Sequence, residues 1–131
     1  MTRPKLHPPR VWLLALLALG CGDKKSGAPG ARDAWQRAGL EVTGFAKVDG
    51  ARFAGGTCQG GKVGGLDAVV CEYADEAAAS RGVQAASATL GEETAAVVPY
   101  GKSVLVVADR AKVDPDGKRM NQVANIFRGK P

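Results

Sequence analysis

The chain has 131 residues, a formal net charge of +5 and an isoelectric point near 9.3. This length suits one ordinary domain and excludes a multidomain enzyme. The 24% of charged and 45% of hydrophobic residues are typical of a globular chain and argue against a disordered one.

The first twenty residues are organised like an export signal. Three basic residues, Arg3, Lys5 and Arg10, precede the unbroken apolar run of residues 11–19, and small residues follow that run. A membrane span needs roughly 20 apolar residues to cross the hydrocarbon layer, and this run is far shorter. We therefore expect residues 1–20 to be a cleaved signal peptide.

The end of this signal resembles the lipobox of bacterial lipoproteins. The stretch Ala18-Leu19-Gly20-Cys21 has the family's small residue and cysteine at its last two positions, with Ala18 where the family usually has Leu. The resemblance covers residues 1–21 and implies that Cys21 receives a diacylglyceryl group and begins the mature chain. The alternative is ordinary signal cleavage at the same bond, which would leave Cys21 as a free thiol.

Residues 21–30 are expected to form the lipidated cysteine and a flexible, polar tether, and residues 31–131 a single small domain. In enteric bacteria, an Asp directly after the lipidated Cys retains a lipoprotein in the inner membrane. Because Gly22 stands at that position, the same resemblance favours the outer membrane. The expected location is the cell envelope of a Gram-negative-type bacterium, with the lipid as anchor.

Most of the positive charge belongs to the leader and tether. Residues 31–131 contain 13 basic and 12 acidic side chains. A domain that binds a polyanion concentrates Lys and Arg in one segment, and no segment of this domain shows such an excess. We therefore expect no nucleic-acid partner.

Cys58 and Cys71 form an even pair once Cys21 is set aside as the anchor. In an oxidising compartment, such a pair with twelve residues between its members favours a structural disulfide. The bridge would contribute about 3 kcal/mol by the loop-entropy estimate. A redox or metal-binding role is the alternative, although the close Cys-x-x-Cys spacing typical of redox sites is absent.

Patterns in the first half of the domain predict a helix and two strands. A short helix over residues 34–38 is capped by Asp33, and a strand follows over residues 41–48, with Val42 and Val48 on one face. Residues 49–65 are rich in glycine and resemble turns, and residues 66–73 form the second strand.

The second half begins with an alanine-rich helix from Asp75 to about Leu90. Two β-rich runs, residues 94–98 and 103–108, are joined by a turn, and a last helix begins at Asp114-Pro115 with Asp as its cap. The last helix has an apolar stripe made of four residues at helical spacing: Met120, Val123, Ala124 and Phe127.

The element order is therefore α-β-β-α-β-β-α. We predict an α+β fold, a two-layer sandwich in which a four-stranded, mainly antiparallel sheet has helices on one face, because each helix has one apolar stripe to cover. Binding domains and enzymes both use such folds, so the fold does not define the function.

Motifs that carry chemistry are weak. Residues 56–62 match the first seven positions of a phosphate-binding loop, but Val63 replaces the hydroxyl residue and a strand follows in place of a helix, so we expect no nucleotide.

His7, the only histidine, lies in the signal, which removes the commonest general base and metal ligand. The pair Asp114/Asp116 is better explained by helix capping. We expect no metal, no cofactor and no catalysis.

Two aromatic residues are candidates for a contact patch. Phe45 lies off the apolar face of its predicted strand, and Tyr100 lies in a predicted turn, so together they are a candidate partner surface. The alternative is that Phe45 packs under the 49–65 segment.

These observations indicate a lipid-anchored cell-envelope lipoprotein whose domain binds or assembles with another envelope component. The alternative is a periplasm-facing module that binds a small ligand or a metal through the glycine-rich segment and nearby carboxylates.

Overall fold

The computed structural model describes residues 27–130, and the predicted signal peptide and Cys21 lie outside this range. Its elements in chain order are α1 (Gly27–Arg37), β1 (Val42–Val48), the 3-10 helix η2 (Gly50–Phe53), β2 (Thr57–Val63), β3 (Leu66–Glu72), α2 (Glu76–Thr89), β4 (Ala95–Tyr100), β5 (Ser103–Ala108) and α3 (Lys118–Phe127). Within residues 27–130, none of the helices has the length and apolar character of a membrane span.

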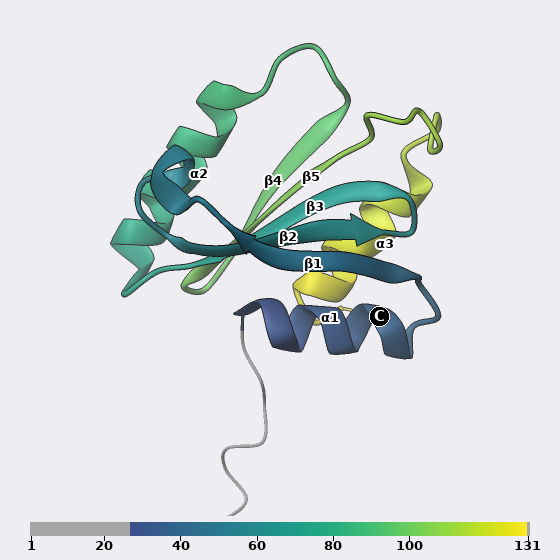
Figure 1. The fold of residues 1–131 in the computed structure, drawn as a ribbon, viewed down its shortest axis with the longest axis horizontal. Coiled ribbons are helices and arrows are strands. Elements are labelled where there is room, and N and C mark those ends of the chain that lie inside the picture. Colours follow the sequence, from purple (N-terminus) through teal and green to yellow (C-terminus); the bar gives the residue numbers. More distant parts are fainter. Residues whose placement is uncertain (1–26, 131) are drawn as a thin grey trace, which may run out of the picture.

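The strands form one open antiparallel sheet in the order β1-β2-β3-β5-β4 (Figure 1). The α+β class and the antiparallel pairing are thus confirmed, but the sheet has five strands and not four, and the element order gains a strand before α2. The added strand is β2, which occupies the second half of the glycine-rich segment. Its hairpin with β3 turns through Gly64 and Gly65, whose positive φ angles of 57° and 88° suit a type I′ turn.

Helices cover both faces of the sheet, so the prediction of a two-layer sandwich with helices on one face is wrong. One face packs against α1 and α3, and the other packs against α2 and η2 (Figure 1). In β5, Leu105 and Val107 belong to the first core, whereas Val104 and Val106 belong to the second. A strand that is apolar on both faces must be covered on both to keep these side chains from water.

The side chain of Trp35 joins α1 to α3 on the first face. The indole is completely buried, and its Nε1–H donates a hydrogen bond to the carbonyl oxygen of Val123 at 3.0 Å. The apolar stripe predicted for the last helix is confirmed, because all four of its members are buried in this core. The stripe thus fixes how α3 lies on the sheet.

The starts of α1 and α3 differ from the predictions. α1 begins at Gly27, so Asp33 lies inside the helix and does not cap it. Residues 27–30, expected in the flexible tether, therefore belong to the folded part, and Ala28 is buried in the core. α3 begins at Lys118 and not at Pro115. α2 begins at Glu76, one residue after the predicted start, and Asp75 caps it.

A β-bulge in β1 changes which residues face each core. Gly44 and Phe45 together lie opposite the single residue Gly61 of β2, which shifts the alternation of side chains by one position. Val42 and Phe45 therefore pack on the α1 side, whereas Val48 packs on the α2 side. The prediction that Val42 and Val48 share a face is wrong for this reason.

Candidate functional site

A groove of about 1020 Å³ lies where α1 begins, where α3 ends and where the β4–β5 turn projects from the sheet. We call it the α1 groove. Its lining includes Gly27 and Ala31 of α1, Tyr100 and Lys102 at the hairpin, and Phe127 of α3. These segments are distant in sequence and meet because α1 and α3 pack together at the same end of the sheet as the hairpin. The volume is at the upper end of the range typical of ligand pockets.

Tyr100 is the exposed aromatic residue of the α1 groove. It ends β4 opposite Ser103, and the two-residue turn between them begins at Gly101, whose φ is 61°. The Tyr100 ring meets Phe127 nearly edge-on with ring centroids 6.2 Å apart, yet 54% of the residue remains exposed. An aromatic side chain that is held on one side and open on the other is well suited to contact a partner.

Phe45 does not join Tyr100 in one patch. The two residues lie on β1 and β4, the opposite edge strands of the sheet, four strand spacings or about 19 Å apart. Phe45 is half-buried against Trp35, with ring centroids 6.1 Å apart, and the Arg32 guanidinium carbon lies 5.9 Å from its ring centre. It therefore packs under α1, on the face of the sheet opposite the one that η2 covers.

A smaller hollow of about 160 Å³ lies on the α2 face, between η2, the end of α2 and the sheet. Its apolar lining includes Phe53, Val69, Leu90 and Val106. Four charged residues also line it: Asp49, Arg52, Asp67 and Arg110. This hollow therefore brings the first half of the glycine-rich segment next to carboxylates and guanidinium groups.

The disulfide between Cys58 and Cys71 is confirmed. The two residues are directly opposite each other on β2 and β3, with Cα atoms 4.0 Å apart, and both are buried in the core beneath α2. A bridge in this position holds β2 to β3 below η2. Nearby, the Tyr73 hydroxyl donates a 2.6 Å hydrogen bond to the Phe53 carbonyl, and burial raises the pKa of the Tyr73 hydroxyl.

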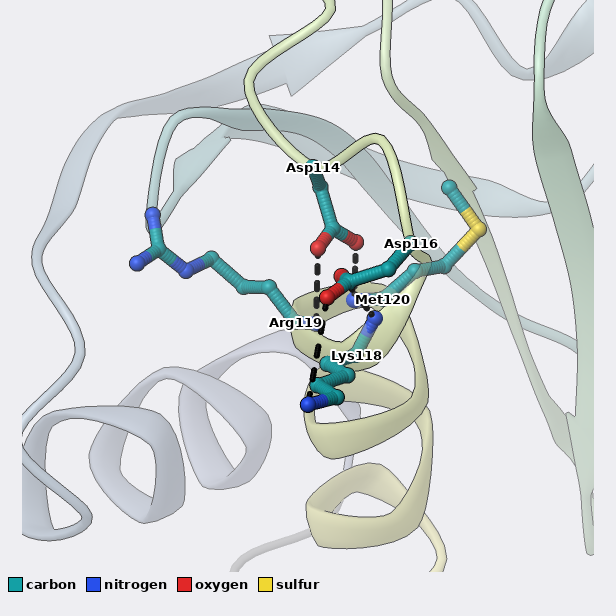
Figure 2. A network of polar contacts seen from close by, with 5 residues as sticks. All are labelled: Asp114, Asp116, Lys118, Arg119 and Met120. Carbon is teal, nitrogen blue, oxygen red and sulfur yellow. Dashed lines mark hydrogen bonds and ion pairs between the residues drawn. The ribbon is translucent and has the colours of Figure 1, made fainter.

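The carboxylate of Asp114 binds the first turn of α3 (Figure 2). Its two oxygens accept hydrogen bonds from the backbone N–H groups of Arg119 at 3.0 Å and Met120 at 2.8 Å. Burial alone would raise the pKa of Asp114, but these N–H groups, a hydrogen bond with Asp116 and the positive charge of Arg119 hold that pKa below its ordinary value. Asp114 thus satisfies helix N–H groups from outside the helix, which agrees with the expected capping role but not with the expected helix start.

Asp109 is a buried polar residue that the sequence did not indicate. Its carboxylate accepts hydrogen bonds from the backbone N–H groups of Val113 and Asp114, both at 2.9 Å. This arrangement shapes the loop between β5 and α3. Its only signal in the sequence is an Asp directly after an apolar strand. Both buried carboxylates are therefore explained by backbone hydrogen bonds.

The segment that resembles a phosphate-binding loop lies mostly in β2. Residues 57–63 all pair with β3, and five of them, Cys58, Gln59, Gly60, Lys62 and Val63, also pair with β1. Within residues 27–130, no group of three His, Cys, Asp or Glu side chains is arranged to hold a metal ion.

Comparison with protein-family models, with curated proteins and with solved structures finds no match for this chain.

Proposed function

We propose that this chain is a lipid-anchored lipoprotein of the bacterial cell envelope, with a non-catalytic domain that binds another envelope component in the α1 groove. The observation that supports this best is the position of the groove. Gly27, which lines it, is the sixth residue after Cys21. Six fully extended residues span at most about 20 Å. An acylated Cys21 would therefore hold the groove within that distance of the membrane surface.

The proposed compartment follows from the same signal. Cleavage before Cys21 places Gly22 after the lipidated residue, which favours the outer membrane over the inner one. The buried Cys58–Cys71 bridge agrees with an oxidising compartment, because disulfides persist in the periplasm and are rare in the cytosol.

The groove is tested by placing a photo-crosslinking amino acid at single positions in the full chain. Tyr100 is the test position, and Val113 is the matched control, because it is 47% exposed and lies beside the Gly64-Gly65 turn at the other end of β3. Illumination of intact cells should give specific adducts with an envelope lipid or protein from position 100 and none from position 113. Equal adducts at both positions, or none at either, would contradict the proposal.

A second candidate function is favoured by the hollow on the α2 face. Its apolar floor and its four charged residues suit a small ligand that carries both an apolar group and charges, such as a free amino acid. The test is a thermal-shift screen with amino acids, using the Arg52→Ala/Arg110→Ala double variant as control. A rise in Tm that the double variant loses would support this function, and no rise with any amino acid would exclude it.

A further inference from the structure

We infer that the α1 groove and the β4–β5 turn lie against the lipid surface of the membrane that anchors Cys21, with Tyr100 at the bilayer interface. This inference rests on the lipid anchor of the proposed function and names the partner of the same groove.

The point at which the tether joins the domain is fixed. Gly27 and Ala28 are buried, and a Cβ added at Gly27 would overlap the carboxylate of Glu72 at the end of β3. The tether therefore leaves the domain from one position on the rim of the α1 groove. Because so few residues separate Cys21 from this position, the anchored domain keeps that end towards the bilayer.

The side chains at this end suit an interface between water and lipid. All four residues at the tip of the β4–β5 hairpin, residues 99–102, are exposed. Tyr100 has an apolar ring and a polar hydroxyl, the combination that is enriched where proteins meet the headgroup region. Lys102 makes no ion pair with any described residue, and it is placed to meet anionic headgroups.

At the opposite end of the sheet Lys112 is also exposed, but the large exposed apolar residue is Val113, which has neither an aromatic ring nor a polar hydroxyl. Val113 is exposed there beside the Gly64-Gly65 turn. The Arg119 guanidinium at this end donates to the Gly64 carbonyl at 2.8 Å. β3 alone separates the two ends by about 20 Å, since each of the six steps between its seven residues rises about 3.3 Å. A probe at Val113 therefore reports a surface that faces away from the membrane.

The test uses the full, lipidated chain in vesicles of phosphatidylethanolamine and phosphatidylglycerol. The variants Tyr100→Cys and Val113→Cys each offer one free thiol for an environment-sensitive fluorophore, because Cys58 and Cys71 are bridged and Cys21 carries the lipid. Lys102→Cys is a second probe of the same tip. We expect the probes at positions 100 and 102 to shift to shorter emission wavelength and to be quenched roughly twofold or more by spin-labelled lipid, whereas the probe at 113 stays in water.

The outcomes separate the inference from the proposed function. If the chain does not float with the vesicles and mass spectrometry finds no lipid on Cys21, the anchor itself is refuted. If the chain floats but the probes at 100 and 102 behave like the probe at 113, the membrane contact is refuted and the anchor stands. Protein adducts from position 100 in cells, without quenching in vesicles, would assign the groove to a protein partner and would also overturn the inference. A urea unfolding transition like that of the parent chain confirms that each variant is folded.

Discussion

Replacing Asp114 by Ala should loosen the start of α3. The Asp114 side chain is buried, with 7% of the residue exposed, and it accepts two backbone hydrogen bonds from the first turn of that helix. The substitution removes both acceptors and leaves the buried N–H of Met120 without its partner. Asp116 is the matched control, because it is exposed and accepts one backbone hydrogen bond, from Lys118 at 3.1 Å.

The expected loss of stability in Asp114→Ala follows from these contacts. A hydrogen bond to a charged group contributes about 1.5–3 kcal/mol, and a buried donor left unpaired costs about 1–3 kcal/mol. Because the two quantities describe the same N–H groups, we expect Asp114→Ala to lower the free energy of unfolding by about 3 kcal/mol in total. That corresponds to a fall in Tm of roughly 10–20 °C for a domain of this size. Asp116→Ala should cost less than about 1 kcal/mol.

The pH dependence gives an independent check. The pKa of Asp114 is lowered in the folded chain, so its charged form stabilises the fold above the unfolded pKa of about 3.9. This contribution is lost as the pH falls through the lower, folded pKa. Urea unfolding should therefore show a constant gap between the parent chain and Asp114→Asn from about pH 5 to 7, and a shrinking gap below about pH 4. Equal stabilities of the two Ala variants, or a gap that persists in acid, would refute the reasoning.

Three further predictions concern the α2 face and β1. The Cys58→Ala/Cys71→Ala double variant should lose about 3 kcal/mol in urea unfolding, and a loss below about 1 kcal/mol would contradict the role of the bridge. Tyr73→Phe should lower the free energy of unfolding by about 1 kcal/mol, because it removes the hydrogen bond to the Phe53 carbonyl. The folded pKa of Tyr73 is raised, so the parent chain should also lose stability in urea unfolding as the pH rises above about 10, and this loss should be smaller in the variant. Gly61→Ala should lower the stability measured by thermal unfolding by about 1–3 kcal/mol, because the added Cβ would lie 2.5 Å from the Thr43 carbonyl oxygen. The control Gly91→Ala should change stability by less than about 0.5 kcal/mol, because its added Cβ would meet only the Glu93 side chain.

Elements with a clear hydrophobic period could be predicted from the sequence. The stripe of α3 and the apolar runs of β3 and β5 each place large apolar residues at a helix or strand spacing, and the structure buries them as that spacing requires. β2 lacks such a signal, because only Cys58 and Val63 of its seven residues are buried and its glycines suggest a turn. β2 is defined by its neighbours β1 and β3, which supply its hydrogen bonds.

Which side chains lie on which face of the sheet, and which helices cover each face, was harder to predict. One reason is local and the other is long-range. The bulge at Gly44 and Phe45 reverses the side-chain alternation within β1, and the sequence has no separate mark for it. The four valine and leucine residues of β5 are apolar on both faces of the strand, but the helices that cover those faces come from distant segments. The start of α1 is built from small residues whose burial depends on tertiary contacts.

The candidate site was predicted in part. The exposure of Tyr100 follows from its place next to a Gly-Lys turn, which the local sequence indicates. The partner of Tyr100 in the groove could not be inferred, because the strand order places Phe45 at the far edge and brings Phe127 and Gly27 to Tyr100 instead.

The identity of the mature N-terminus tests the central claim most directly. The measurement is mass spectrometry of the N-terminal peptide of the full-length chain, purified with detergent from the envelope of the producing bacterium. The account predicts a chain that begins at Cys21 and carries the added mass of a diacylglyceryl group on its sulfur. A mature chain with a free thiol at Cys21, or a chain that still carries residues 1–20, would contradict it.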